Sequence, residues 1–477
     1  MTDTPNTPND KALATLPLPK GERAGERGSP KRIAPRLFIA ATLSLLTPTG
    51  LAQDLVHKAA PQAQPIIITG ATVHTAGGPT YENGTIHFDE GRITYVGPES
   101  RAPRPRPDTR RIDATGMHVA PGFFAADTRI GLVEVNAVRA TRDFNEVGGI
   151  TPEVRANSAI NPDTTLLPVA RSGGILLAGV FPSGGRVPGR VNVVRLDGWT
   201  TEDMTVDAGG PQGTAGLILD WPSMRPNTAW WNDTPASEQQ RNIDNAVKAI
   251  DQVWDDAEAY MNAREADDTH PQDIRFDAMI PVIEGESPLI IAANDYDQIV
   301  TSVTWAKSRG YDVIINGGQD ADLAADLLLE HDVPVIISGT HVFPKRADQP
   351  HDHAYTLPKR LYESGIDFAL GTADRDGNVR NLPFEAGMAA RFGLPKSEAL
   401  RAVTLAPAQI FGVDEDYGSL EEGKSATLII STHDPLEVRS YVLHAFIDGR
   451  GIDLTNKQRA LADKYREKYR QLGLINE

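Results

Sequence analysis

Residues 288–318, PLIIAANDYDQIVTSVTWAKSRGYDVIINGG, decide the fold class. Two short apolar runs, PLIIAAN (288–294) and DVIING (312–317), flank a helix-like segment at 297–310. A strand, a helix and a second strand in this order are typical of a βαβ unit, whose two strands run parallel. The stretch therefore predicts an α/β fold.

The same alternation continues on both sides of this stretch. Further apolar runs lie at 174–181, 215–220, 333–339 and 367–373, and further helix-like segments lie at 236–266 and 320–332. Repeated strand–helix units favour a (β/α)8 TIM-type barrel, which we place at residues 121–415. Within it, residues 191–204 are interpreted as an excursion from the barrel.

Strand-like segments flank this region at both ends of the chain. Segments that alternate apolar and polar residues, as half-buried strands do, lie at 65–78, 84–98, 425–435 and 438–450. We expect residues 65–120 and 416–454 to form one composite β-sandwich domain. A helix is predicted at 455–473, after the second β-segment.

Composition excludes several classes of function. The chain has 477 residues, a formal net charge of −17 and no cysteine. Nucleic-acid binding needs a clustered basic surface, so this charge argues against a nucleic-acid partner. Without cysteine, thiolate catalysis, cysteine-ligated zinc and disulfides are excluded.

The N-terminal segment has the pattern of a signal peptide. An apolar run, LFIAATLSLL (37–46), follows Lys31, Arg32 and Arg36 and precedes the small-x-small site Gly50-Leu51-Ala52. We therefore interpret residues 1–52 as a polar extension plus a signal peptide. The expected location is the periplasm or the cell exterior, and no membrane span is expected in the mature chain.

Five further segments resemble one known family. They are IIITGATVHTAGG (66–78), RIDATGMHVAPGFF (111–124), ALGTADRDG (369–377), FIDGR (446–450) and, most strongly, EALRAVTLAPAQIFGVDEDYGSLEEGKSATLIISTHDPL (398–436). Over residues 65–450 the chain resembles the amidohydrolase superfamily, in particular its imidazolonepropionase-like branch. The resemblance implies the barrel with its composite β-domain, and it implies hydrolysis assisted by a divalent metal such as zinc.

The positions that would hold this metal carry other residues. The first-strand histidine pair of the family matches Asp127 and Arg129, and the two later histidines match Ala292 and Asn316. The eighth-strand aspartate matches Ala373 or, one step later, Asp374. Arginine has no lone pair to give a metal and alanine offers no ligand atom. We therefore expect no metal and no other cofactor at the family site.

Asp127 and Asp374 are the candidate catalytic residues, either one as general base. Residues two apart on a strand face the same side, so Asp127 and Arg129 should both enter the barrel mouth. Arg129 is expected to pair with Asp127 or Asp374, and Arg129 and Asn316 are candidates for binding the substrate carbonyl. The alternative is an internal Asp–Arg–Asn network that fills an inactive site.

The predicted loop SGTHVFPKRADQPHDHAYTLPKR (338–360) should lie on the same face. Lys345 and Arg346 are candidates for binding an anionic group of the substrate. His341, His351 and His353 could form an alternative metal site, although a solvated loop with chance histidines is the preferred interpretation.

Two functions stay open. The first is a hydrolase of carbon–nitrogen bonds other than peptide bonds, acting on a small amide or cyclic amide. The second is a non-catalytic binding protein, or the inactive partner of a metal-competent relative. The partners expected are a small-molecule substrate and, as an option, copies of this chain or a related amidohydrolase. The substrate itself cannot be derived from the sequence, because the fold does not determine it.

Overall fold

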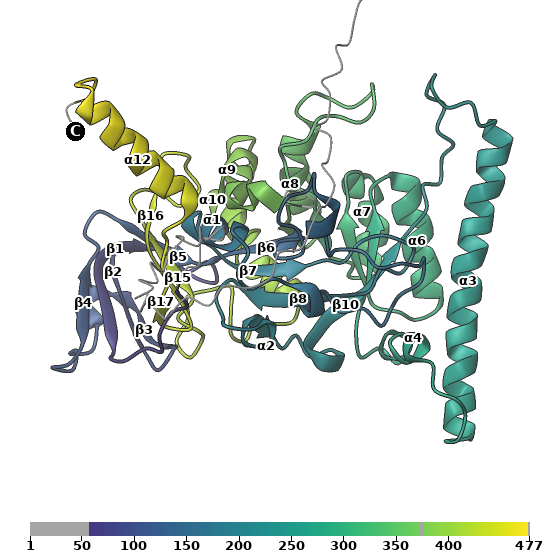
Figure 1. Cartoon of the computed structure of the whole chain (residues 1–477), viewed down its shortest axis with the longest axis horizontal. Helices are drawn as coiled ribbons and strands as arrows, with labels where there is room; N and C mark the ends of the chain where they lie inside the picture. The colour runs from purple at the N-terminus through teal and green to yellow at the C-terminus, as the bar shows by residue number, and fades with distance from the viewer. Residues whose placement is uncertain (1–56, 373–375, 476–477) are drawn as a thin grey trace, which may run out of the picture. The chain divides into compact units, whose positions relative to one another are not determined.

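Two β-sheets organise the part of the chain that the structure describes (Figure 1). The computed structural model describes residues 57–372 and 376–475, all of which belong to one compact unit, Ala52–Glu477. The segment interpreted as polar extension and signal peptide, residues 1–52, lies outside these residues, and so does Asp374.

The first sheet combines strands from both ends of the described chain, in the order β17-β16-β15-β5-β1-β2-β3, with β4 beside β1. These strands are β1 (Ile66–Val73), β2 (Tyr81–Asp89), β3 (Arg92–Pro98), β4 (Arg110–Asp113), β5 (His118–Pro121), β15 (Leu428–Ser431), β16 (Val442–Ile447) and β17 (Arg450–Gly451). One apolar cluster serves the whole sheet, and in it the rings of Phe88 and Phe446 meet edge to face with centroids 5.1 Å apart. Segments more than 300 residues apart in the sequence therefore share one core.

The second sheet has the order β14-β13-β12-β11-β10-β8-β7-β6, with the short β9 beside β8. Its strands are β6 (Phe123–Thr128), β7 (Ile175–Val180), β8 (Arg190–Arg195), β9 (Thr205–Val206), β10 (Thr214–Asp220), β11 (Leu289–Ala293), β12 (Val313–Gly317), β13 (Val335–Ile337) and β14 (Phe368–Leu370). One buried cluster takes residues from all eight strands of the main path, among them Phe124, Ile290 and Ile314. A cluster shared in this way lies inside a curved, barrel-like sheet.

The ends of this sheet nearly close on each other. Thr372, just after β14, donates its backbone N–H to the carbonyl of Asp127 in β6 over 2.9 Å. Seven strands of the path run in one direction, but β8 is antiparallel to both β7 and β10. The residues interpreted as an excursion, 191–204, thus contribute a reversed strand to the sheet itself.

Helices cover the outer face of this barrel-like sheet. The α-helices are α1 (Leu166–Ser172), α2 (Thr201–Met204), α3 (Ala236–Ala266), α4 (Ile274–Asp277), α5 (Ile280–Ile283), α6 (Tyr296–Ser308), α7 (Ala325–Glu330), α8 (His353–Ser364), α9 (Leu382–Arg391), α10 (Lys396–Arg401), α11 (Leu405–Ile410) and α12 (Lys457–Gln471). Single 3-10 turns lie at Glu99–Arg101, Arg139–Thr141, Ala156–Ala159, Pro211–Gly213, Ala321–Ala324 and Asp376–Asn381. Buried side chains of α3, α6 and α7 share one cluster with the outer face of the strands.

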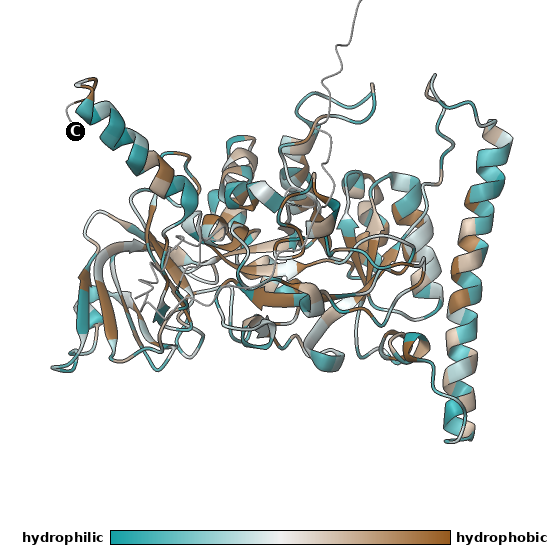
Figure 2. Cartoon of the chain, in the orientation of Figure 1, coloured by the Kyte–Doolittle hydropathy of each residue, from teal (hydrophilic) through white to brown (hydrophobic). Residues whose placement is uncertain are grey.

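Hydropathy follows this layering, since the strands of the second sheet are mostly apolar, those of the first sheet mix apolar and polar residues, and the two long helices α3 and α12 carry much polar surface (Figure 2). Helix α3 buries Ile250, Trp254, Ala257 and Tyr260, which lie in its middle and second half. Helix α12 buries none of its residues. No helix in the described part of the chain combines the length and the apolar character needed to cross a bilayer.

Candidate active site at the mouth of the barrel-like sheet

Asp127 and Asn316 meet at the carboxyl ends of β6 and β12. Each is the last residue but one of its strand, and the carboxyl ends of these two strands open on the same side of the sheet. The Nδ2 atom of Asn316 donates a hydrogen bond to Oδ2 of Asp127 over 3.1 Å. Asp127 is only 7% exposed. Two of the predicted site residues, 189 positions apart in the sequence, are thus in direct contact.

The position of Asp127 depends on a glycine in the neighbouring segment. A Cβ atom at Gly371 would lie 2.8 Å from the Cβ of Asp127, which is closer than side chains tolerate. Only a residue without a side chain lets the segment after β14 pass this close to β6. Gly371 therefore places the end of β14 against the candidate site.

Arg129 lies just beyond the end of β6, and its described carboxylate partner is Asp376. The Arg129 backbone N–H donates to Asp376 Oδ1 over 2.9 Å, and the guanidinium NH2 lies 3.4 Å from Oδ2. The guanidinium also lies over the ring of Phe144, 4.4 Å from its centroid. The pairing of Arg129 with Asp127 or Asp374 that the sequence predicts stays a prediction, because Asp374 lies outside the described residues.

The half-buried side chain of Arg346 pairs with an acidic residue that was not predicted from the sequence. It forms an ion pair with Asp320, whose side chain is 2% exposed, and Gln349 Nε2 donates to the other oxygen of Asp320 over 3.3 Å. The hydrogen bond to Asp320 is the main cause that raises the pKa of Arg346 above its ordinary value. Lys345 is exposed. Of the two predicted anion-binding residues, Arg346 thus already neutralises a carboxylate of the protein.

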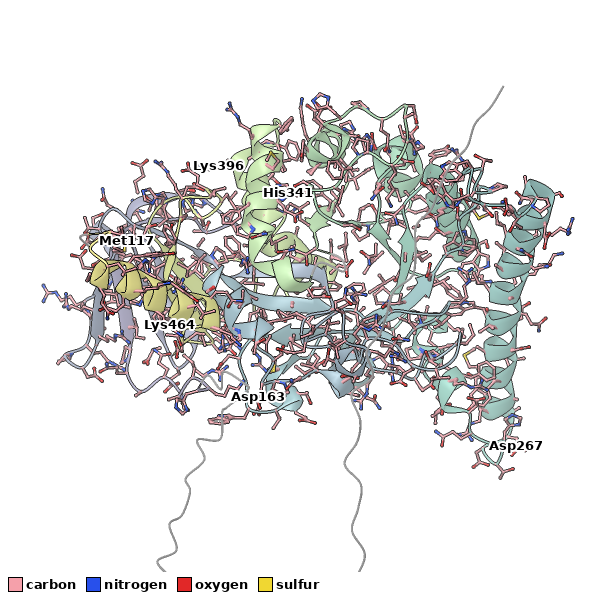
Figure 3. The ribbon with its side chains drawn as sticks, turned by 45° about the horizontal axis from the view of Figure 1, so that its top comes forward. Met117, Asp163, Asp267, His341, Lys396 and Lys464 are labelled. Atoms are coloured by element: carbon pink, nitrogen blue, oxygen red, sulfur yellow. The ribbon has the colours of Figure 1, made fainter. Side chains whose placement is uncertain are left out.

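The three histidines of this region do not converge. His353 begins α8, and its ring nitrogens meet the Gln319 carbonyl at 3.0 Å and the Arg360 guanidinium at 3.3 Å. His341 (Figure 3) lies 3.9 Å from the carboxylate of Glu385, which also accepts the Thr340 N–H over 2.7 Å. With its nitrogens engaged in this way, His353 has no lone pair directed at a shared ion.

The described residues at the mouth do not fit a catalytic zinc site. Such a site needs three protein ligands with free lone pairs and an open position. At the matched positions, Ala292 has no ligand atom, the amide of Asn316 donates its N–H to Asp127, and Arg129 brings a cation. Within 57–372 and 376–475, the one group of three ligand-type side chains with atoms close enough for a shared ion lies elsewhere, in the first sheet.

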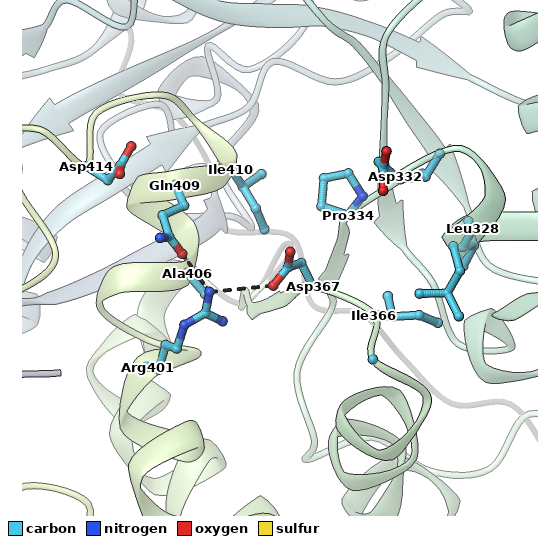
Figure 4. A pocket seen from close by; sticks show the side chains of 13 residues that line it. Leu328, Asp332, Pro334, Ile366, Asp367, Arg401, Ala406, Gln409, Ile410 and Asp414 are labelled. Atoms are coloured by element: carbon cyan, nitrogen blue, oxygen red, sulfur yellow. Dashed lines mark hydrogen bonds and ion pairs between the residues drawn. The ribbon is translucent and has the colours of Figure 1, made fainter. Parts of the chain in front are cut away.

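A pocket on the opposite side of the barrel-like sheet is not the candidate site (Figure 4). Pro334 and Asp367 line it and lie immediately before β13 and β14, at the amino ends of these strands. Its wall is braced by Arg401, which donates to Asp367 over 3.5 Å and to Gln409 over 2.6 Å. Barrels of this class use the carboxyl ends of their strands for chemistry, and their amino ends serve stability.

Sequence analysis missed three buried carboxylates near the mouth, those of Asp376, Asp320 and Glu385. The only available signal for Asp376 was the second acidic residue of ALGTADRDG, two positions after the one that was chosen. For Glu385 it was an acidic residue inside the otherwise apolar run LPFEAGMAA (382–390). Neither pattern predicts which cation or N–H group the carboxylate contacts.

Comparisons with known proteins agree with this architecture. A sequence model of the amidohydrolase family matches residues 313–451. The chain is 26% identical over 422 residues to an imidazolonepropionase of Symbiobacterium thermophilum, covering 76% of this chain and 90% of the relative. It is 22% identical over 398 residues to the amidohydrolase tasK of Hapsidospora irregularis, covering 77% of this chain but only 39% of that longer relative.

A solved structure shares the fold. The crystal structure of an amidohydrolase from Thermotoga maritima MSB8 superposes with a TM-score of 0.71, at 22% identity, over 81% of this chain and 99% of that one. The superposition covers 81% of the chain, which is more than the region of the second sheet alone, so it includes residues of both sheets. The mixed α/β architecture with a nearly closed sheet is thus one that a known protein also adopts.

Proposed function

Because the chain belongs to the amidohydrolase superfamily, we propose that it hydrolyses a carbon–nitrogen bond in a small non-peptide amide or cyclic amide. One relative is named imidazolonepropionase, and an imidazolone is a cyclic compound, which favours a cyclic amide as the substrate. The observation that carries the proposal is the buried Asp127 carboxylate at the carboxyl ends of the strands, oriented by Asn316.

In the proposed reaction Asp127 is the general base. It takes a proton from water while the water oxygen attacks the carbonyl carbon, and it returns this proton to the nitrogen as the carbon–nitrogen bond breaks. The cation of Arg129 stands two residues away and stabilises the negative charge that develops on the carbonyl oxygen. Asp374 is the alternative base, and its role stays a prediction because it lies outside the described residues.

Asn316 has a second function in this proposal. Its Nδ2 is committed to Asp127, while its Oδ1 is buried and has no hydrogen-bond partner in the described protein. An unsatisfied buried acceptor is costly unless a ligand or water fills it. We assign this oxygen to the amide N–H of the substrate, with Lys345 as the exposed cation for an anionic substituent.

The proposal includes no metal ion or other cofactor at positions 127, 129, 292 and 316. Family members bind a divalent metal at such a site, where it generates hydroxide from water at neutral pH. Here the charge of Arg129 takes the place of the metal charge, and Asp127 must supply the base itself.

One observation favours the second candidate, a non-catalytic binding protein or inactive partner of a metal-competent relative. Asp127 is satisfied by Asn316, and Arg129 is satisfied by Asp376 and Phe144. A network whose charged members already neutralise each other needs no substrate for its stability. The two candidates therefore differ in turnover and not in the contacts described.

The two candidates can be separated with a panel of small amides, lactams and imidazolones. Wild-type protein should hydrolyse at least one of them with and without a chelator, and Asp127→Asn should lower kcat by about 10²–10⁴-fold. Asp267→Asn, an exposed carboxylate far along the chain (Figure 3), is the matched control and should keep full activity. Binding of a panel member without turnover supports the second candidate. The proposal is overturned if the wild type holds stoichiometric zinc, if a chelator strips this zinc with loss of activity, and if Asp127→Ala also abolishes zinc binding.

The finer features of architecture and location belong to the same proposal. We propose that the second sheet is a TIM-type barrel at 121–415 with β8 reversed, and that residues 65–120 and 416–454 form a composite β-sandwich domain. We also propose export to the periplasm or the cell exterior, with N-terminal sequencing of secreted protein expected to begin near Gln53. A mature chain that retains residues 37–46 would contradict export.

A further inference from the structure

Three side chains with metal-binding atoms come together in the first sheet, away from the mouth of the second. His74, His118 and Asp434 each offer one ligand atom, and these atoms all lie within 4.8 Å of one another. The Nε2 atom of His74 is 2.9 Å from Nδ1 of His118, and the two rings stack at an interplanar angle of 7°.

The register of the sheet explains why they meet. His118 is the first residue of β5, which pairs in parallel with the end of β1, so the chain passes from Val73 to His74 beside it. Strand β15 runs antiparallel to β5, and its last residue, Ser431, is paired with His118. The loop after β15 then carries Asp434 back to the same edge. Three strand ends from distant parts of the sequence thus converge on one point.

From this geometry we propose that His74, His118 and Asp434 form a binding site for a divalent transition metal such as zinc. Two imidazoles and one carboxylate are a known zinc ligand set, and three protein ligands leave a fourth position open. This site is separate from the one proposed for hydrolysis, and it stands whether or not that proposal holds.

The two imidazoles need only a small adjustment to bind one metal ion. In a tetrahedral zinc site, bonds to nitrogen place neighbouring ligand atoms roughly 3.3 Å apart. The two ring nitrogens at 2.9 Å share one hydrogen bond and need only separate by a few tenths of an ångström. A shift of the donating ring to its other tautomer then frees both lone pairs without net loss of a proton.

Asp434 is already positioned and carries a competing cation. Its Oδ1 accepts the backbone N–H of Leu436 over 3.1 Å, which fixes the carboxylate, and Lys396 Nζ lies 2.8 Å from Oδ2. The side chain of Lys396 (Figure 3) is 58% exposed and can therefore move away, whereas Asp434 is 13% exposed. A metal ion would either displace Lys396 from the Asp434 carboxylate or bind this carboxylate together with Lys396.

The open position faces a cavity. His74, Lys396 and Asp434 all line a cavity of about 480 Å³, which also contacts the glycine pair Gly77 and Gly78. A metal held by the three ligands can therefore exchange water or a small anion at its fourth position, as sites with three protein ligands do.

The test is metal binding by the purified full-length chain after removal of bound metal, with zinc or cobalt(II) chloride as the probe. Calorimetry should show one equivalent of zinc, and cobalt(II) should give the absorption of a tetrahedral nitrogen–oxygen site. Loss of an outer-shell partner alone costs about 10–100-fold in affinity, so His74→Gln, His118→Gln and Asp434→Asn should each weaken zinc binding by at least about 100-fold. Lys396→Ala should tighten it by about threefold or more, because the competing cation is gone.

Two controls separate this site from others. His444→Gln removes an exposed histidine of the same sheet, and Asp127→Asn changes the barrel mouth, so both should bind zinc as the wild type does. If a ligand variant does not fold, the Lys396→Ala arm and the cobalt spectrum of the wild type decide the question. The inference is overturned if calorimetry shows no uptake of zinc by the wild type, if the histidine variants bind zinc normally, or if Lys396→Ala weakens zinc binding.

Discussion

At the scale of single residues, the mouth of the barrel-like sheet is a set of matched polar contacts. Asp127 and Asn316 could be chosen from the sequence because they match metal-ligand positions of the family that the chain resembles. Both lie near the ends of apolar strands, and strand ends of parallel sheets gather on one side. The contact between Asp376 and Arg129 could not be predicted, because the sequence of this loop does not show which of its carboxylates lie beside Arg129. Partner choice among long side chains depends on tertiary packing, which local sequence does not encode.

The ion pair of Arg129 with Asp376 gives the first prediction. The side chains are 13% and 5% exposed, so removing one partner leaves a largely buried charge. Arg129→Met and Asp376→Asn should each lower the free energy of unfolding by about 3 kcal/mol, and the double variant should lose less than the sum. Urea denaturation measures all three.

The exposed pair Arg466–Asp463, with side chains 64% and 72% exposed, is the control for this pair. Arg466→Met should cost less than about 1 kcal/mol, since a surface ion pair contributes little. Strict additivity of the two mouth substitutions would show that Arg129 and Asp376 do not depend on each other.

At the scale of secondary-structure elements, hydrophobic periodicity was sufficient for most of the fold. The segment predicted as a helix at 236–266 is α3 with the same bounds, and the apolar runs at 288–294 and 312–317 contain β11 and β12. The reversed strand β8 was missed as a member of the sheet. Its sequence, RVNVVR, is less apolar than those of β7 and β10. Its direction is set by its connections, because the link from β7, residues 181–189, is too short for a parallel crossover.

The contact between β14 and β6 gives the second prediction. Gly371→Ala would place a methyl group 2.8 Å from the Cβ of Asp127 and should cost about 1–3 kcal/mol in the free energy of unfolding. Gly377→Ala, six residues later, meets no atom within 4 Å and should stay within about 0.5 kcal/mol of the wild type. Thermal unfolding of the two variants side by side measures the difference, and equal stability would mean that the two segments separate easily.

The packing of α3 gives the third prediction. Its buried residues lie between Ile250 and Tyr260, and Trp254 is fully enclosed among them, with its ring centroid 5.0 Å from that of Tyr311. Trp254→Ala should therefore cost about 3–5 kcal/mol. Trp230→Ala, at a position 90% exposed in the segment before this helix, should change the unfolding midpoint very little. A small effect at Trp254 would show that α3 does not pack against Tyr311 as described.

At the scale of the whole described unit, the two sheets are joined by polar contacts as well as by shared core. The turn between β16 and β17 carries Asp448, whose Oδ2 accepts a hydrogen bond from Arg195 at the end of β8 over 2.9 Å. Its Oδ1 accepts hydrogen bonds from Ser425 over 2.7 Å and from Tyr417 over 3.1 Å. One carboxylate of the first sheet thus ties the last strands of the chain to the reversed strand of the second.

This carboxylate makes the joint sensitive to acid. Burial alone would raise the pKa of Asp448, but the hydrogen bonds from Ser425, Arg195 and Tyr417 outweigh it and hold the pKa below its ordinary value. A carboxyl group with a lowered folded-state pKa stabilises the protein above its unfolded pKa of about 4, and this contribution is lost as the pH falls through the folded value.

Asp448→Asn should therefore be less stable than the wild type at pH 7, and the difference should shrink as the pH falls below about 4. Urea midpoints of both proteins at pH 7, 4 and 3 measure it. Because other acids titrate equally in the two proteins, the difference isolates Asp448, and a difference that stays constant from pH 7 to pH 3 would mean that this carboxylate does not couple the two sheets to acid.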